Sequence, residues 1–129
     1  MAHKSRLAGF IIDCRSDRVE TAAEFWSAAL GLPITDPNEG GEGKYAVLGD
    51  TPGDLHIEVQ RVAHESRVHL DIETDDIDAE VARLTTLGAV EVSRPHDGRW
   101  VVMQAPTGQR FCVVRLRNAK KGPRLNRWD

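Results

Sequence analysis

The stretch RVHLDIETDDIDAEVARLTTLGA, residues 67–89, predicts a strand followed directly by a helix. Residues 67–73 are expected to form the strand, and Asp75-Asp76 are acids of the kind that begin a helix. Gly88 ends the helix, because glycine readily adopts the left-handed conformation of a helix C-terminus. Between these limits apolar side chains recur at helical spacing, at Ile77, Val81, Leu84 and Leu87.

The first half of the chain repeats this order. A strand over residues 7–14 precedes a helix that opens at Asp17, with Glu20 three residues later as in a capping box. Gly31 ends this helix, and Pro33 prevents its continuation. The opening acids of the two helices lie roughly sixty residues apart, and the two closing glycines keep that offset to within two residues. The chain is therefore an internal duplication.

Three strands are predicted after each helix. Turn residues separate them, including Gly40-Gly41 and Asp97-Gly98. The fold class is thus α+β, with two tandem β-α-β-β-β modules that form a curved mixed sheet around a cavity. We expect one domain over residues 1–129. Its modules span about residues 7–62 and 67–116, and the six strands lie at residues 32–35, 45–48, 55–62, 89–93, 100–104 and 110–116.

Composition and charge exclude several classes of partner. The net charge of -3 gives no electrostatic reason to expect nucleic acid, and no apolar run approaches the roughly 20 residues that span a bilayer. With a polar N-terminus and two cysteines, Cys14 and Cys112, expected to be free thiols, the protein is predicted to be cytoplasmic. The basic tail, residues 117–129, is expected to be a solvated end.

Three segments resemble a known family. They are AEFWSAALGLPI at residues 23–34, the stretch at residues 67–89 quoted above, and APTGQRFCVV at residues 105–114. Together they resemble the vicinal oxygen chelate superfamily of glyoxalase I, extradiol dioxygenases, fosfomycin-resistance enzymes and bleomycin-binding proteins, and within it a glyoxalase-like subgroup. The resemblance implies the duplicated fold, a small-molecule ligand and a homodimer.

Catalytic members of that superfamily bind a divalent metal through residues on four strands. Carried over by position, His69 fits the ligand of the fifth strand, and Glu58, or Gln60 in a shifted register, fits that of the fourth. Phe10 falls at the first-strand position, where it cannot bind metal, and Cys112 replaces the glutamate of the eighth strand. The resemblance therefore implies an incomplete metal site, although a thiolate is a good ligand for zinc.

Two histidines precede a carboxylate by two positions, His56 with Glu58 and His69 with Asp71. This spacing places each pair on one face of its strand. Such a pair is either a general base with an oriented imidazole or an ordinary polar pair on a solvated sheet face. The aromatic side chains of Tyr45 and Trp100 lie on strands expected to wall the cavity, where they could stack on a planar ligand.

We therefore expect a small-molecule binding protein of the glyoxalase and bleomycin-resistance type, without a cofactor. The alternative is a divalent-metal-dependent lyase, isomerase or dioxygenase acting on a small oxygenated substrate, with His69 and Glu58 as metal ligands. A third possibility is metal-independent acid-base chemistry at the same two residues. The candidate ligand-binding residues are Phe10, Tyr45, His56, Glu58, Gln60, His69, Asp71, Trp100 and Cys112.

Overall fold

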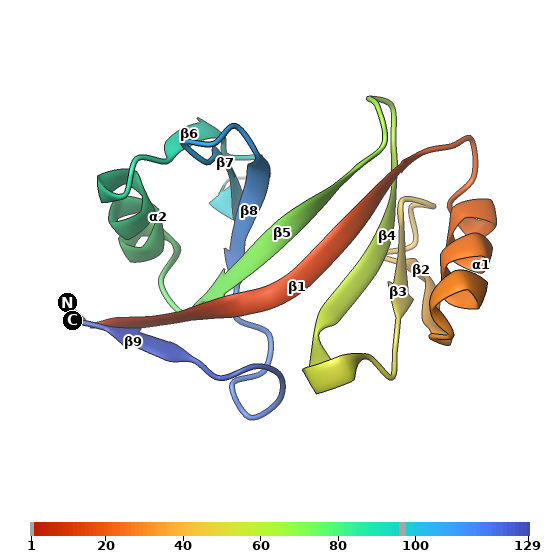
Figure 1. The fold of residues 1–129 in the computed structure, drawn as a ribbon, viewed down its shortest axis with the longest axis horizontal. Helices are drawn as coiled ribbons and strands as arrows, with labels where there is room; N and C mark the ends of the chain where they lie inside the picture. Colours follow the sequence, from red (N-terminus) through yellow and green to blue (C-terminus); the bar gives the residue numbers. More distant parts are fainter. Residues whose placement is uncertain (1, 96–97) are drawn as a thin grey trace. The chain divides into compact units, whose positions relative to one another are not determined.

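The computed structural model describes residues 2–95 and 98–129. These residues divide into two compact units, one of residues 9–68 and the other of the residues before 9 together with those from 69 on (Figure 1). The turn predicted at Asp97-Gly98 begins outside the described residues. No helix among the described residues is long and apolar enough to cross a membrane.

The unit of residues 9–68 has one helix on a four-stranded mixed sheet. The strands lie in the order β2-β3-β4-β1, in which β1 and β4 run parallel and the other neighbours antiparallel. Val19 and Ala23 of the helix pack on Ile12, Ile57 and Val59 of the sheet, and all five side chains are buried. The elements are β1 (His3–Arg15), α1 (Val19–Leu30), β2 (Ile34–Glu39), β3 (Tyr45–Leu48), η1 (Pro52–Asp54) and β4 (His56–Val62).

The second unit repeats this arrangement. Its strands lie in the order β5-β8-β7-β6, with β5 and β8 parallel, and its core joins Val81 and Leu84 of α2 to Val101, Met103 and Val113 of the sheet. The elements are β5 (Arg67–Thr74), α2 (Ile77–Thr86), β6 (Val90–Ser93), β7 (Trp100–Gln104), β8 (Arg110–Arg115) and β9 (Asn126–Trp128). The predicted α+β class and the repeated β-α-β-β-β order are confirmed, and the cavity stays a prediction.

The two helix starts differ in how they are capped. Asp76 is the N-cap of α2, and its carboxylate accepts a hydrogen bond of 3.0 Å from the backbone amide of Ala79, as predicted. The N-cap of α1 is Arg18 instead of the predicted Asp17, and Arg18 makes no capping hydrogen bond through its side chain to any described residue. The helix therefore begins one residue later than the sequence pattern indicated. Gly31 ends α1 in the left-handed conformation, with φ 69°.

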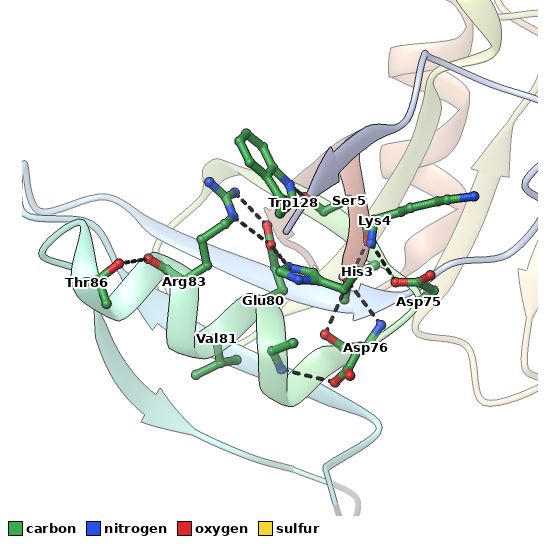
Figure 2. Close-up of polar contacts among 12 residues, drawn as sticks. His3, Lys4, Ser5, Asp75, Asp76, Glu80, Val81, Arg83, Thr86 and Trp128 are labelled. Carbon is green, nitrogen blue, oxygen red and sulfur yellow. Dashed lines mark hydrogen bonds and ion pairs between the residues drawn. The ribbon is translucent and has the colours of Figure 1, made fainter. Parts of the chain in front are cut away.

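The prediction of a solvated tail holds for its basic side chains Arg117, Lys120, Lys121, Arg124 and Arg127, which are exposed, but not for its last residues. Asn126–Trp128 form β9, which pairs antiparallel with His3–Ser5 of β1. The indole Nε1 of Trp128 donates a hydrogen bond of 2.8 Å to Ser5 Oγ (Figure 2). The buried guanidinium of Arg6 also donates to backbone carbonyls in the segment that leads to β9, those of Asn118 and Pro123. These contacts satisfy buried donors that the local sequence cannot reveal.

Candidate functional site

The polar residues of β4 lie on the sheet face opposite α1. Ile57 and Val59 point into the core beneath the helix, so His56, Glu58 and Gln60 share the other face, as the alternation predicts. His56 Nε2 forms a hydrogen bond with the carboxylate of Glu58, whose exposed fraction is only 3%. The two residues therefore form a pair of a half-buried imidazole and a buried carboxylate.

The backbone of β1 holds this pair from one side. Gly9 lies opposite His56 in the parallel register, and a Cβ atom on Gly9 would lie 1.9 Å from the His56 carbonyl oxygen. No side chain other than hydrogen fits there without separating the strands. The close approach of β1 and β4 thus depends on a glycine.

The sequence left open whether Glu58 or Gln60 occupies the ligand position of the fourth strand. In the structure both side chains lie on the same face of β4, so the face does not distinguish between them. Gln60 is half-buried, and its amide Nε2 donates a hydrogen bond of 3.1 Å to the hydroxyl of Tyr45. Tyr45 lies opposite Gln60 in the β3–β4 register. The predicted site residues of β3 and β4 are therefore neighbours on one polar face.

Phe10 does not belong to that face. In the β1–β4 register Phe10 lies opposite Ile57 and packs against the core beneath α1, whereas Ile11 lies opposite Glu58. Counting back seven residues from the predicted N-cap Asp17 gives Phe10, but the same count from Arg18 gives Ile11. The one-residue error in the helix start moved the first-strand position to the wrong side of the sheet. Ile11 cannot bind a metal either.

Asp13 is a polar-face residue that the sequence reasoning missed. It lies opposite Gln60 and is 2% exposed, and its Oδ2 is 3.7 Å from the guanidinium Nε of Arg67. A signal was available, because Asp13 stands at the same place in the first module as Asp71 in the second. Both are acids six residues before the first residue of the following helix.

In the second unit three predicted residues meet on the sheet face opposite α2. His69 and Asp71 lie two positions apart on β5, and Cys112 of β8 lies opposite Asp71 in the parallel register. The imidazole nitrogen, carboxylate oxygen and sulfur of these residues all lie within 4.8 Å of one another. His69 Nε2 is 3.5 Å from Asp71 Oδ1, an oxygen that is buried and accepts no hydrogen bond from any described residue.

This donor set fits a divalent metal. Nitrogen, oxygen and sulfur donors together are typical of zinc sites, and three protein ligands leave a fourth position open. The set differs from the four-strand arrangement that the resemblance implies, because all three donors come from β5 and β8. Glu58, predicted as a ligand together with His69, lies in the other unit and is not a member of this cluster. Within the second unit, the residues that would hold a metal are His69, Asp71 and Cys112.

Trp100 lies on the same face of the second unit. It is half-buried on β7, and Val102, two positions on, lies opposite Cys112. At the other end of β7 Gln104 accepts a hydrogen bond of 2.9 Å from the Arg110 guanidinium, a contact that the sequence did not indicate. Both cysteines are free thiols and are half-buried, and burial raises the pKa of the Cys14 thiol.

The fold agrees with the comparison to known families. A family model described as a glyoxalase-like domain matches residues 9–114. The chain belongs to this glyoxalase-like family, and its membership of the vicinal oxygen chelate superfamily, predicted from three sequence segments, is confirmed. No curated protein sequence matches the chain.

Several solved structures share the fold. A methylmalonyl-CoA epimerase in complex with methylmalonyl-CoA and NH4+ is 20% identical, with a TM-score of 0.61 over 92% of this chain and 99% of its own. The methylmalonyl-CoA epimerase of Mycobacterium tuberculosis is 17% identical, with a TM-score of 0.63 over 88% and 89%. A hypothetical protein from Bacillus halodurans C-125 is 14% identical, with a TM-score of 0.63 over 88% and 96%. At these identities the likeness concerns the fold.

Proposed function

We propose that this chain is a small-molecule binding protein of the glyoxalase-like type and that its ligand contacts the polar face of residues 9–68. The observation that supports the proposal is the His56–Glu58 pair, whose carboxylate is buried on the face that α1 does not cover. Burying a carboxylate costs free energy, so such groups concentrate at functional sites. The homodimer and the cytoplasmic location implied by the sequence belong to the same proposal.

The chemistry of this face indicates the kind of ligand. A carboxylate can accept up to about four hydrogen bonds, so Glu58 can accept from a ligand N–H or O–H group in addition to His56. Tyr45 offers a ring for stacking and a hydroxyl that already bonds to Gln60. The favoured ligand therefore carries hydrogen-bond donors beside a planar or apolar part.

A second candidate function is that of a divalent-metal-dependent lyase, isomerase or dioxygenase acting on a small oxygenated substrate. The cluster of His69, Asp71 and Cys112 favours it. A metal bound there would polarise an oxygen atom of the substrate. The chain's own residues would hold the metal on three sides and leave the fourth side to the substrate.

Ligand titrations in the presence of a chelator test the first proposal. The probes are methylmalonyl-CoA, which one structural neighbour binds, and bleomycin, the ligand of the bleomycin-binding members of the superfamily. We expect at least one probe to raise the melting temperature saturably and to bind in calorimetry without being converted. Glu58→Gln should weaken binding at least about tenfold, because it removes a charged hydrogen-bond acceptor.

The matched control is Glu24→Gln, which changes an exposed glutamate of α1 in the same way. It should leave the affinity unchanged. Equal affinities in wild type and Glu58→Gln would contradict the assignment of the ligand to this face. Turnover that depends on added metal would instead support the second candidate function.

A further inference from the structure

We infer that His69, Asp71 and Cys112 form a zinc-type metal site built within the second unit alone. The inference deepens the second candidate function and rests on it only for what the bound metal would do. The site itself rests on three observations: the proximity of the three donor atoms, an unsatisfied buried oxygen on Asp71, and the mixture of donor types.

The first line of evidence is the buried carboxylate of Asp71, which has one oxygen without a hydrogen bond from the described residues. Glu73 lies two positions further along the same strand face, and its buried carboxylate receives 2.9 Å and 3.4 Å contacts from Arg6 and Arg117. Asp71 is equally buried, at 4% exposed, yet its Oδ1 accepts no hydrogen bond from the described residues and lies 3.5 Å from His69. A buried carboxylate oxygen without a hydrogen bond is costly, and a cation between Asp71 and its neighbours would lower that cost.

The pairing of β5 with β8 brings the three donors together within the second unit. The two-residue spacing on β5 directs His69 and Asp71 to one face, and the parallel register places Cys112 directly opposite Asp71. In a tetrahedral zinc site with bonds of about 2.0–2.3 Å, neighbouring ligand atoms are about 3.3–3.8 Å apart. The three donor atoms lie within 4.8 Å of one another, so side-chain rotations that bring them about 1 Å closer would complete the site.

The donor types select the metal. A cysteine thiolate with an imidazole and one carboxylate favours zinc, and Co2+ as its spectroscopic substitute, over Mg2+, which prefers an all-oxygen shell. This preference departs from the oxygen- and imidazole-rich set that the resemblance implies for catalytic members. The substitution of a glutamate by Cys112 on β8 thus changes which metal the site takes.

The test uses the full chain without an affinity tag. Protein stripped with chelator is incubated with Zn2+, Co2+ or Mg2+, desalted, and analysed for bound metal and melting temperature. We expect about one equivalent of Zn2+, no retained Mg2+, and a thiolate-to-cobalt charge-transfer band with Co2+. Cys112→Ser should abolish the band, and Asp71→Asn, which keeps the side-chain shape, should weaken Zn2+ binding at least about tenfold.

The chain supplies a matched control in Cys14, a second half-buried free cysteine that lies in the other unit. Cys14→Ser should keep both the band and the zinc stoichiometry. Failure to retain zinc, a band that survives Cys112→Ser, or unchanged affinity in Asp71→Asn would overturn the site. The ligand titrations that test the first proposal are made in the presence of a chelator, so their outcome does not depend on whether this site binds zinc. Zinc bound without any turnover would end the second candidate function and leave the site standing.

Discussion

Glu80 is the buried centre of a polar cluster that attaches β1 and β9 to α2, and its replacement tests that role. Its carboxylate accepts two hydrogen bonds of 2.8 Å from the Arg83 guanidinium, one from Nε to Oε1 and one from Nη2 to Oε2 (Figure 2). A third hydrogen bond, of 2.7 Å, joins Oε1 to His3 Nε2. The guanidinium of Arg83 also lies 3.9 Å from the ring centroid of Trp128. Glu80→Gln keeps the volume but removes the charge that the three donors share.

The expected loss of stability follows from burial. The Glu80 side chain is fully buried, and a hydrogen bond to a charged group contributes about 1.5–3 kcal/mol. The side-chain amide that the substitution introduces would also place an N–H donor against one of the existing donors. Arg83 is 24% exposed and regains some hydration, so the net cost should be about 2–3 kcal/mol. For a domain of this length that lowers the melting temperature by roughly 6–12 °C.

Differential scanning calorimetry at pH 7 measures this loss, and the chain offers a matched control. Glu91 and Arg94 have the same spacing and the same two-bond geometry as Glu80 and Arg83, but Glu91 is 39% exposed. Glu91→Gln should therefore change the melting temperature much less, because surface pairs contribute little. A fall of less than about 2 °C in Glu80→Gln, or equal falls in both variants, would refute the reasoning.

The same variant has a predictable pH dependence. Burial by itself would raise the pKa of the Glu80 carboxyl, but hydrogen bonds from Arg83, His3 and Ser5 hold it below its ordinary value. A lowered pKa in the folded state means that the stabilisation is complete above the unfolded pKa of about 4.3 and is lost as the pH falls through the folded value. The difference in melting temperature between wild type and Glu80→Gln should therefore shrink from pH 7 to pH 3. A constant difference would contradict this.

Two further predictions concern β1. Gly9→Ala should destabilise the protein by about 1–3 kcal/mol, because its Cβ would meet the backbone of β4 at His56. An unchanged urea midpoint would show that the strands can separate there without cost. Burial raises the pKa of the Cys14 thiol and the charge of Asp13 adds to this, against a hydrogen bond with Trp26 that lowers it. Iodoacetamide at pH 8 should therefore modify Cys14 much more slowly in folded protein than in urea, as peptide mass spectrometry can measure, and equal rates would contradict it.

Local patterns in the sequence predicted both long helices, the strands β1 to β8 and their repeat, but not β9. β3 and β7 have the predicted bounds, Asp76 caps α2, and Gly31 ends α1, because alternation and capping depend on residues close together in the chain. The alternation of β4 also assigned His56, Glu58 and Gln60 to one face. The three segments with family resemblance led to the correct superfamily.

The tertiary structure decided how residues from different elements meet. The parallel register of β5 and β8 places Asp71 opposite Cys112. The register of β1 and β4 places Ile11, and not the predicted Phe10, on the polar face, because α1 begins one residue later than expected. The last residues of the basic tail, Asn126–Trp128, pair with β1 as the strand β9. Local patterns cannot specify these contacts, because a shift of one residue between distant strands leaves each strand's own pattern intact while it reverses which side chains share a face.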